Sequence, residues 1–94
     1  MHQDRNRTGE RAALFSAADL LPGDEGCIRC LLLPKHIRQR LAAEGIFPGV
    51  RLHCVRRKPA AGLIWLRTDC GQLVLTQQTA EGILLRKEDV CRLS

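Results

Sequence analysis

The sequence has few of the residues from which several kinds of functional site are built. Its 94 residues include no tyrosine, two phenylalanines and one tryptophan. A platform for stacking nucleic-acid bases is therefore hard to assemble, and nucleic acid is not an expected partner. The sequence contains no G-x-x-x-x-G-K-[ST], G-x-G-x-x-G or H-E-x-x-H motif. Nothing resembles a nucleophile beside an activating base, so we expect neither an enzyme nor a bound cofactor.

Long hydrophobic runs are also missing. The longest, residues 31–33 and 63–66, fall far short of the ~20 residues that a helix needs to cross a bilayer. The N-terminus begins M-H-Q-D-R-N-R-T-G-E-R, which has no apolar segment of the kind found in secretory signals. We therefore expect a cytoplasmic protein that does not insert into a membrane.

The remaining composition is that of one small globular domain. Apolar residues make up 45% of the chain, charged residues 27%, and the net charge is +5. This is too hydrophobic for a disordered chain and too short for two cores. Residues 1–15 mix charges without periodicity and are expected to form an N-terminal arm. Residues 16–94 are expected to form the domain.

Hydrophobic periodicity and turn residues predict a mainly β fold. A helix is predicted over residues 35–44, ending at Gly45, and a tight hairpin turn at Asp69-Cys70-Gly71. Short helical turns are predicted near residues 16–19, 76–82 and 87–90. The predicted strands cover residues 26–33, 50–58, 63–67, 72–76 and 83–85. About five short strands, with one principal helix between the first two, suggest a small, partly open barrel.

The five cysteines do not form a disulfide framework, because their number is odd and no secretory signal precedes them. Cys27 and Cys30 have the spacing of zinc and redox motifs. In a regular strand, however, such residues point to opposite faces, so one of the pair should face the core. Packing in the core is the simpler interpretation. Cys27, Cys30 and His36 remain weak candidates for a metal site, and a metal- or redox-responsive domain remains the alternative function.

Three segments in order resemble the FeoA family, the small cytosolic component of bacterial ferrous-iron transport. They are L-P-G-D-E-G at residues 21–26, R-Q-R-L-A-A-E-G-I-F-P-G at 38–49 and V-R-R-K-P at 55–59. The resemblance covers about residues 16–86. It implies an SH3-like barrel and a non-catalytic accessory role. It also implies docking to FeoB, the membrane transporter with a cytosolic GTP-binding domain, and modulation of iron uptake or GTP turnover.

Positive charge is concentrated in residues 35–58, which contain seven cationic residues and one acidic residue. One interpretation is a solvated helix face followed by an edge strand that its cations protect. The other is an electrostatic dock for an acidic protein surface, with Trp65 as an anchor. A homo-oligomer also remains open, because exposed strand edges self-associate. The residues expected to contact a partner are Lys35, Arg38, Arg40, Arg51, Arg57 and Trp65.

Overall fold

The computed structural model describes residues 14–87. Most of the predicted N-terminal arm and the last three residues of the predicted turn at 87–90 lie outside this range. Within it, no helix is both long enough and apolar enough to cross a membrane.

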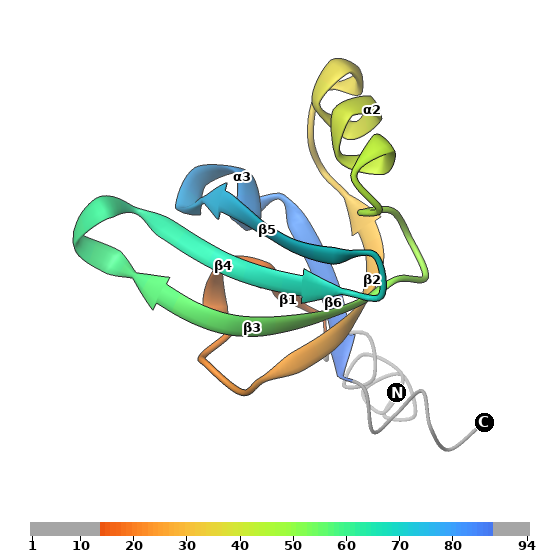
Figure 1. The fold of residues 1–94 in the computed structure, drawn as a ribbon. Coiled ribbons are helices and arrows are strands. Elements are labelled where there is room, and N and C mark those ends of the chain that lie inside the picture. The colour runs from red at the N-terminus through yellow and green to blue at the C-terminus, as the bar shows by residue number, and fades with distance from the viewer. Residues whose placement is uncertain (1–13, 88–94) are drawn as a thin grey trace, which may run out of the picture.

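The described chain folds as one open antiparallel sheet of six strands with short helices at its margins (Figure 1). The order of the strands across the sheet is β1-β6-β2-β3-β4-β5. The strands are β1 (Phe15–Ser16), β2 (Glu25–Leu31), β3 (Arg51–Lys58), β4 (Leu63–Thr68), β5 (Gly71–Thr76) and β6 (Ile83–Lys87). The helices are α2 (Lys35–Ala43), α3 (Gln77–Glu81) and the 3-10 turns η1 (Ala17–Asp19) and η2 (Pro59–Ala61).

The fold class is mainly β, consistent with the predicted SH3-like fold, but two details of the prediction were wrong. The sheet has six strands rather than five, and α2 lies between the second and third strands. Both differences come from β1, where Phe15 pairs with Leu85 and Ser16 with Leu84 of β6. Two residues are too few to show an alternating pattern, so this strand exists only through its pairing with the distant β6.

One face of the sheet forms the core. Alternate residues of β3, β4 and β6 are buried, as the period of two in the sequence predicts. The fully buried large side chains are Leu20, Ile28, Ile46, Leu52, Ile64, Leu66, Ile83 and Leu85. The predicted hairpin turn is confirmed, because Thr68 pairs with Gly71 across Asp69 and Cys70.

The end of α2 is sharply defined, as predicted. Gly45 adopts a left-handed backbone with φ of +93°, and its N–H bonds to the carbonyl of Ala42. A Cβ at this glycine would lie 3.1 Å from the sulfur of Cys70. The chain then folds back, so that Ile46 N–H donates to the carbonyl of Leu41 and its side chain enters the core. These contacts fix where α2 leaves the sheet.

Candidate functional site

Helix α2 projects from the body of the molecule and carries exposed cations (Figure 1). Of its nine residues, Leu41 is the one that is buried, and Ile37 is half-buried. Three of the predicted contact residues, Lys35, Arg38 and Arg40, lie on it with exposed side chains. The helix is therefore a positively charged surface element with a narrow apolar anchor.

The N-terminal end of α2 lacks the features that usually stabilise the start of a helix. Its N-cap is Pro34, which supplies no side-chain hydrogen bond, and its first turn contains no acidic residue. Lys35 and Arg38 instead lie near the N-terminus, where the helix dipole is already positive. Residues that do not stabilise their own secondary structure are often found at functional surfaces. The placement of Lys35 and Arg38 therefore favours a binding role for these cations.

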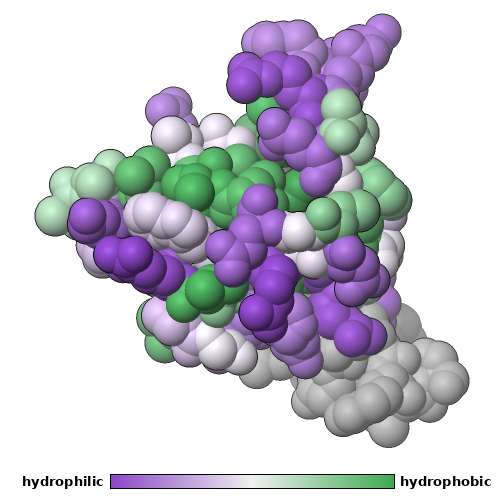
Figure 2. Space-filling view, in the orientation of Figure 1, coloured by the Kyte–Doolittle hydropathy of each residue, from purple (hydrophilic) through white to green (hydrophobic). Residues whose placement is uncertain are grey.

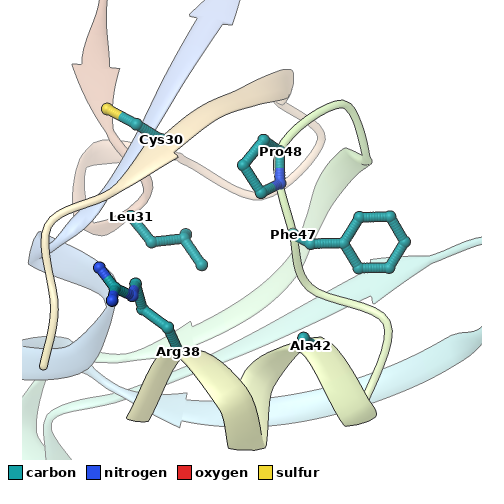
Figure 3. A pocket seen from close by; sticks show the side chains of 6 residues that line it. All are labelled: Cys30, Leu31, Arg38, Ala42, Phe47 and Pro48. Carbon is teal, nitrogen blue, oxygen red and sulfur yellow. The ribbon is translucent and has the colours of Figure 1, made fainter. Parts of the chain in front are cut away.

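A cleft of about 420 Å³ lies between α2, the end of β2 and the segment after the helix (Figure 3). Its walls are mostly apolar, and Arg38 is its charged residue. Figure 3 shows Leu31 reaching toward the cleft, while the sulfur of Cys30 and the ring of Phe47 turn away from it. The lining residues are Cys30, Leu31, Arg38, Ala42, Phe47 and Pro48. Such a cleft can hold an apolar group beside a cation. It contains no pair of groups suited to acid–base or nucleophilic chemistry.

The sequence analysis did not identify this cleft. Two signals pointed to it: the run of three leucines at residues 31–33 and the apolar segment after Gly45. Runs of this kind usually pack in a core. The structure instead leaves Leu32 68% exposed and Phe47 45% exposed. In each run, one residue is buried in the core (Leu31 or Ile46) and the next is exposed at the surface (Leu32 or Phe47).

A second groove separates the other side of α2 from β5. The helix and its C-cap contribute Ile37, Arg40, Leu41 and Glu44, and the strand contributes Val74 and Leu75. Thr79 of α3 completes the lining. Helix α2 thus stands between two hollows rather than packing flat on the sheet.

The structure separates the predicted contact residues instead of gathering them on one face. Arg51 begins β3, at the opposite end of that strand from the hairpin with β4 (Figure 1). Arg57 is half-buried, and its guanidinium donates to the carbonyl of Leu20 at 2.6 Å and to Gln77 Oε1 at 3.3 Å. The cations of residues 35–58 are therefore continuous in the sequence but divided in space between α2 and β3.

Trp65 lies on the outward face of β4 and is half-buried. The guanidinium carbon of Arg56 sits 4.9 Å from the centroid of its ring, within the range of a cation–π contact. On the other side, Trp65 pairs with Val74 of β5, which is 45% exposed. These three residues form a row across β3, β4 and β5, which we call the Trp65 row.

The prediction that one of Cys27 and Cys30 faces the core was wrong. A β-bulge between Ile28 and Cys30 shifts the register of β2 against β6. Ile28 and Leu31 consequently both point inward, and the two cysteines both lie on the outward face. Cys27 Sγ contacts the carbonyl of Gly49 at 3.7 Å.

The other metal candidate, His36, is exposed on α2. Among residues 14–87, no group of three or more histidines, cysteines or acidic residues is placed to hold a metal ion. His53 bonds to Glu25 across β2 and β3, with Nε2 2.9 Å from Oε1. The metal- or redox-responsive alternative therefore stays a prediction.

Two further thiols differ in their surroundings. Cys54 is 2% exposed, and burial raises the pKa of its thiol, an effect that the nearby Arg57 cation partly offsets. Cys70, in the hairpin turn, is exposed. Cys54 is thus a core residue that alternates with His53 and shares the buried face of Leu52, and Cys70 is the more accessible of the two for reaction.

The fold is shared with solved FeoA proteins. A crystal structure of an iron uptake regulatory protein (FeoA) is 22% identical, with a TM-score of 0.71, over 78% of this chain and 96% of that one. The solution structure of FeoA from Chlorobium tepidum is 23% identical, with a TM-score of 0.70, over 77% and 70%. A manganese-dependent transcriptional repressor matches at 21% identity with a TM-score of 0.74, over 79% of this chain and 41% of the repressor.

At these identities, the structural likeness shows a common fold. No curated protein matches the sequence. The family model described as the FeoA domain matches residues 16–87, which is most of the chain and almost the segment that carries the resemblance noted in the sequence. This chain therefore belongs to the FeoA family.

Proposed function

We propose that this chain is a non-catalytic accessory protein of ferrous-iron transport. It docks to the cytosolic region of a FeoB-type transporter and modulates iron uptake or GTP turnover there. Membership of the FeoA family suggests the role in ferrous-iron transport. The single observation that supports docking is α2, a projecting helix with exposed cations, two of which, Lys35 and Arg38, lie near its N-terminus and do not stabilise it.

The charges of α2 suit contact with an acidic protein surface. Lys35, Arg38 and Arg40 are exposed and share a helix of nine residues that contains no acidic side chain. Exposed charges of this kind contribute little to the stability of a monomer. Across an interface they accelerate association and reject partners of the wrong charge. The helix is therefore better explained as a docking element than as a structural one.

The cleft beside α2 adds an apolar component to the same surface. Arg38 lines the cleft together with Leu31, Ala42 and Pro48, and the exposed ring of Phe47 lies on the far side, turned outward (Figure 3). An interface with an apolar centre and a charged rim has the composition of stable protein contacts. Docking there acts through contact alone and requires no reacting group on this chain.

Not every predicted contact residue is equally suited to this role. Arg57 already bonds to Leu20 and Gln77, so its substitution would confound binding with folding. Arg51 and Trp65 lie on β3 and β4 rather than on the projecting helix. The proposal therefore rests on Lys35, Arg38 and Arg40.

The test is an NMR titration of the labelled chain with the isolated GTP-binding domain of the transporter at near-physiological salt. We expect shifts confined to α2 and its cleft. The double variant Arg38→Glu with Arg40→Glu should bind at least about tenfold more weakly, because it reverses two charges at the interface. Lys58→Glu is the control, since this exposed cation lies at the end of β3, in the hairpin.

Three outcomes would count against the proposal. If the double variant binds as tightly as the original chain, the cations of α2 are not the contact. If Lys58→Glu weakens binding equally, the effect is one of net charge rather than of a site. No shifts at high concentration would exclude this domain of the transporter as the target.

A further inference from the structure

The sheet ends at β5, and the outer edge of this strand is open. Strand β5 pairs with β4 and is the last strand of the sheet. An unpaired edge presents backbone N–H and C=O groups that a further strand can use. Which groups these are follows from the register.

The register shows which residues of β5 point their backbone outward. Gln77 N–H donates to the carbonyl of Gly62 at 2.7 Å, which makes residues 62 and 77 a hydrogen-bonded pair. Hydrogen-bonded and non-hydrogen-bonded pairs alternate along an antiparallel ladder. Leu66 is therefore hydrogen-bonded to Leu73, and Ile64 is hydrogen-bonded to Leu75. The backbone groups of Gln72 and Val74 therefore point away from β4.

Within the described chain, no hydrogen bond reaches Gln72 or Val74 from the open side. Thr76 adds an outward N–H, while its side chain caps α3 by accepting from Thr79 N–H at 3.2 Å. Gln72, Val74 and Thr76, at every second residue of the edge, thus have outward backbone groups. These are enough to pair with a short extended segment.

Along this edge, Val74 is exposed and apolar, and it lies between the exposed polar side chains of Gln72 and Thr76. Figure 2 shows hydrophobic side chains gathered over the part of the sheet that ends in β5, between the polar surface of α2 and the β3–β4 hairpin. Val74 is 45% exposed and belongs to the Trp65 row. A residue of an added strand opposite Val74 would extend this row and bury more of it. The groove between β5 and α2 would receive side chains from the other face of that strand.

The charges around the edge select an acidic occupant. Arg40 lines the groove, Arg67 is exposed and pairs with Gln72, and Arg56 covers Trp65. The acidic residues of the surrounding elements are Glu44 of the groove, Asp69 of the hairpin turn and Glu81 of α3. The excess of positive charge comes from α2, which adds Lys35 and Arg38. A second copy of the chain would bring the same cations together, which opposes self-pairing.

We infer that the edge of β5 binds an extended acidic segment of a partner protein, which adds to the sheet as a seventh strand beside α2. Main-chain hydrogen bonds from Gln72 and Val74 supply affinity. Apolar residues on one face of the added strand contact Val74, and carboxylates on its other face reach Arg40 in the groove. This inference does not depend on iron transport or on the transporter, so its failure would leave the proposed function standing.

The probe is a capped eight-residue peptide of alternating glutamate and valine, added to the labelled chain. We expect the amides of Gln72, Val74 and Thr76 to exchange more slowly once the peptide is bound. The same peptide with lysine in place of glutamate should bind at least about tenfold more weakly, because its charges repel the edge.

The matched variants are Val74→Pro and Val74→Thr. Proline removes an N–H that β4 does not use, so the ladder survives, and edge strands tolerate this residue. We expect Val74→Pro to lower affinity at least about tenfold and Val74→Thr, which keeps the N–H, to change it by less than about threefold. The amide exchange of the unmodified chain gives an independent readout if the proline variant does not fold.

Four results would overturn the inference. Equal binding of the lysine peptide would remove the charge requirement. Unchanged affinity of Val74→Pro would mean that side chains rather than the strand edge make the contact. Slow exchange of Gln72 and Val74 amides without peptide would mean that the edge is already occupied within this chain. Protection that rises with protein concentration would identify a second copy as the occupant.

Discussion

The two helices of this molecule differ in a way that their lengths do not suggest. Helix α3 has five residues, yet it is closely packed: Ala80 is fully buried, and Ser16 Oγ donates to its carbonyl at 3.1 Å. Helix α2 has nine residues and buries Leu41 alone. The shorter helix is capped by Thr76, whereas the longer one starts at Pro34 without a side-chain cap.

This contrast separates structural from functional sequence. Most helical stability in proteins comes from packing rather than from helix propensity, so α3 persists because it is packed against the sheet and η1. Helix α2 is attached through a small apolar anchor, and three of its other positions carry exposed cations. Substitutions around α3 should therefore alter stability first, and substitutions on α2 should alter binding first.

The largest effect should come from Gly82, which follows α3. A Cβ at this position would lie 2.5 Å from Leu33 Cδ2 and 2.8 Å from the carbonyl oxygen of Leu32. The backbone oxygen cannot swing aside, so Gly82→Ala forces the segments apart. We expect the free energy of unfolding in urea to fall by about 3 kcal/mol.

The control for this prediction is Ala43→Gly in α2, which changes the same methyl group in the opposite direction. Ala43 is exposed, so the cost should be about 1 kcal/mol, from helix propensity alone. If Gly82→Ala costs no more than Ala43→Gly, then α3 is not the tightly packed element described above.

The second effect concerns the anchor of α2. Leu41→Ala should lower the free energy of unfolding by about 2 kcal/mol, the low end for a buried leucine, because a helix flanked by two hollows can relax into the space. Circular dichroism at low denaturant should show helix loss before the sheet unfolds. A single cooperative transition with a loss above about 4 kcal/mol would contradict the view of α2 as a loosely attached element.

The sequence predicted the parts of the fold that depend on local pattern. The period of two in β3, β4 and β5, the hairpin turn at Asp69 and Cys70, and the helix end at Gly45 each follow from a few adjacent residues. Strand β1 did not, since two residues acquire their strand conformation only from β6. The bulge in β2 was also not predicted, because no residue in the sequence of that strand marks where its register against β6 shifts.

The candidate site was predicted less well, for a related reason. Charge along the chain identified the cations of α2 correctly as an exposed group, but it also included Arg57, which turns inward to bond with Leu20. Adjacent cations on a strand point to opposite faces, so a charge count cannot separate Arg56 from Arg57. The cleft and the open edge of β5 depend on the arrangement of elements far apart in sequence, which no local pattern records.

The third effect tests how firmly α3 is fixed from β3. Arg57→Met should lower the free energy of unfolding by about 1.5 kcal/mol, because the buried carbonyl of Leu20 and the amide of Gln77 lose their charged donor. Its neighbour Arg56 provides a matched control. Arg56→Met removes a cation–π contact with Trp65 and should cost about 0.5 kcal/mol. Equal losses in urea denaturation for the two variants would show that the Arg57 contacts do not stabilise α3.

The smallest effect has the opposite sign and would separate the two helices most clearly. Lys35 begins α2, where the positive end of the helix dipole and Arg38, one turn later, both disfavour a cation. Lys35→Glu should therefore raise the free energy of unfolding by about 0.5 kcal/mol, measured in urea at low salt, and the gain should shrink as salt is added. The same variant should bind the GTP-binding domain of the transporter more weakly. A gain in stability together with a loss of binding would mean that the cation is maintained for contact, at the expense of the helix that carries it. If stability falls while binding is unchanged, Lys35 serves the fold, and the distinction between a structural α3 and a functional α2 does not hold.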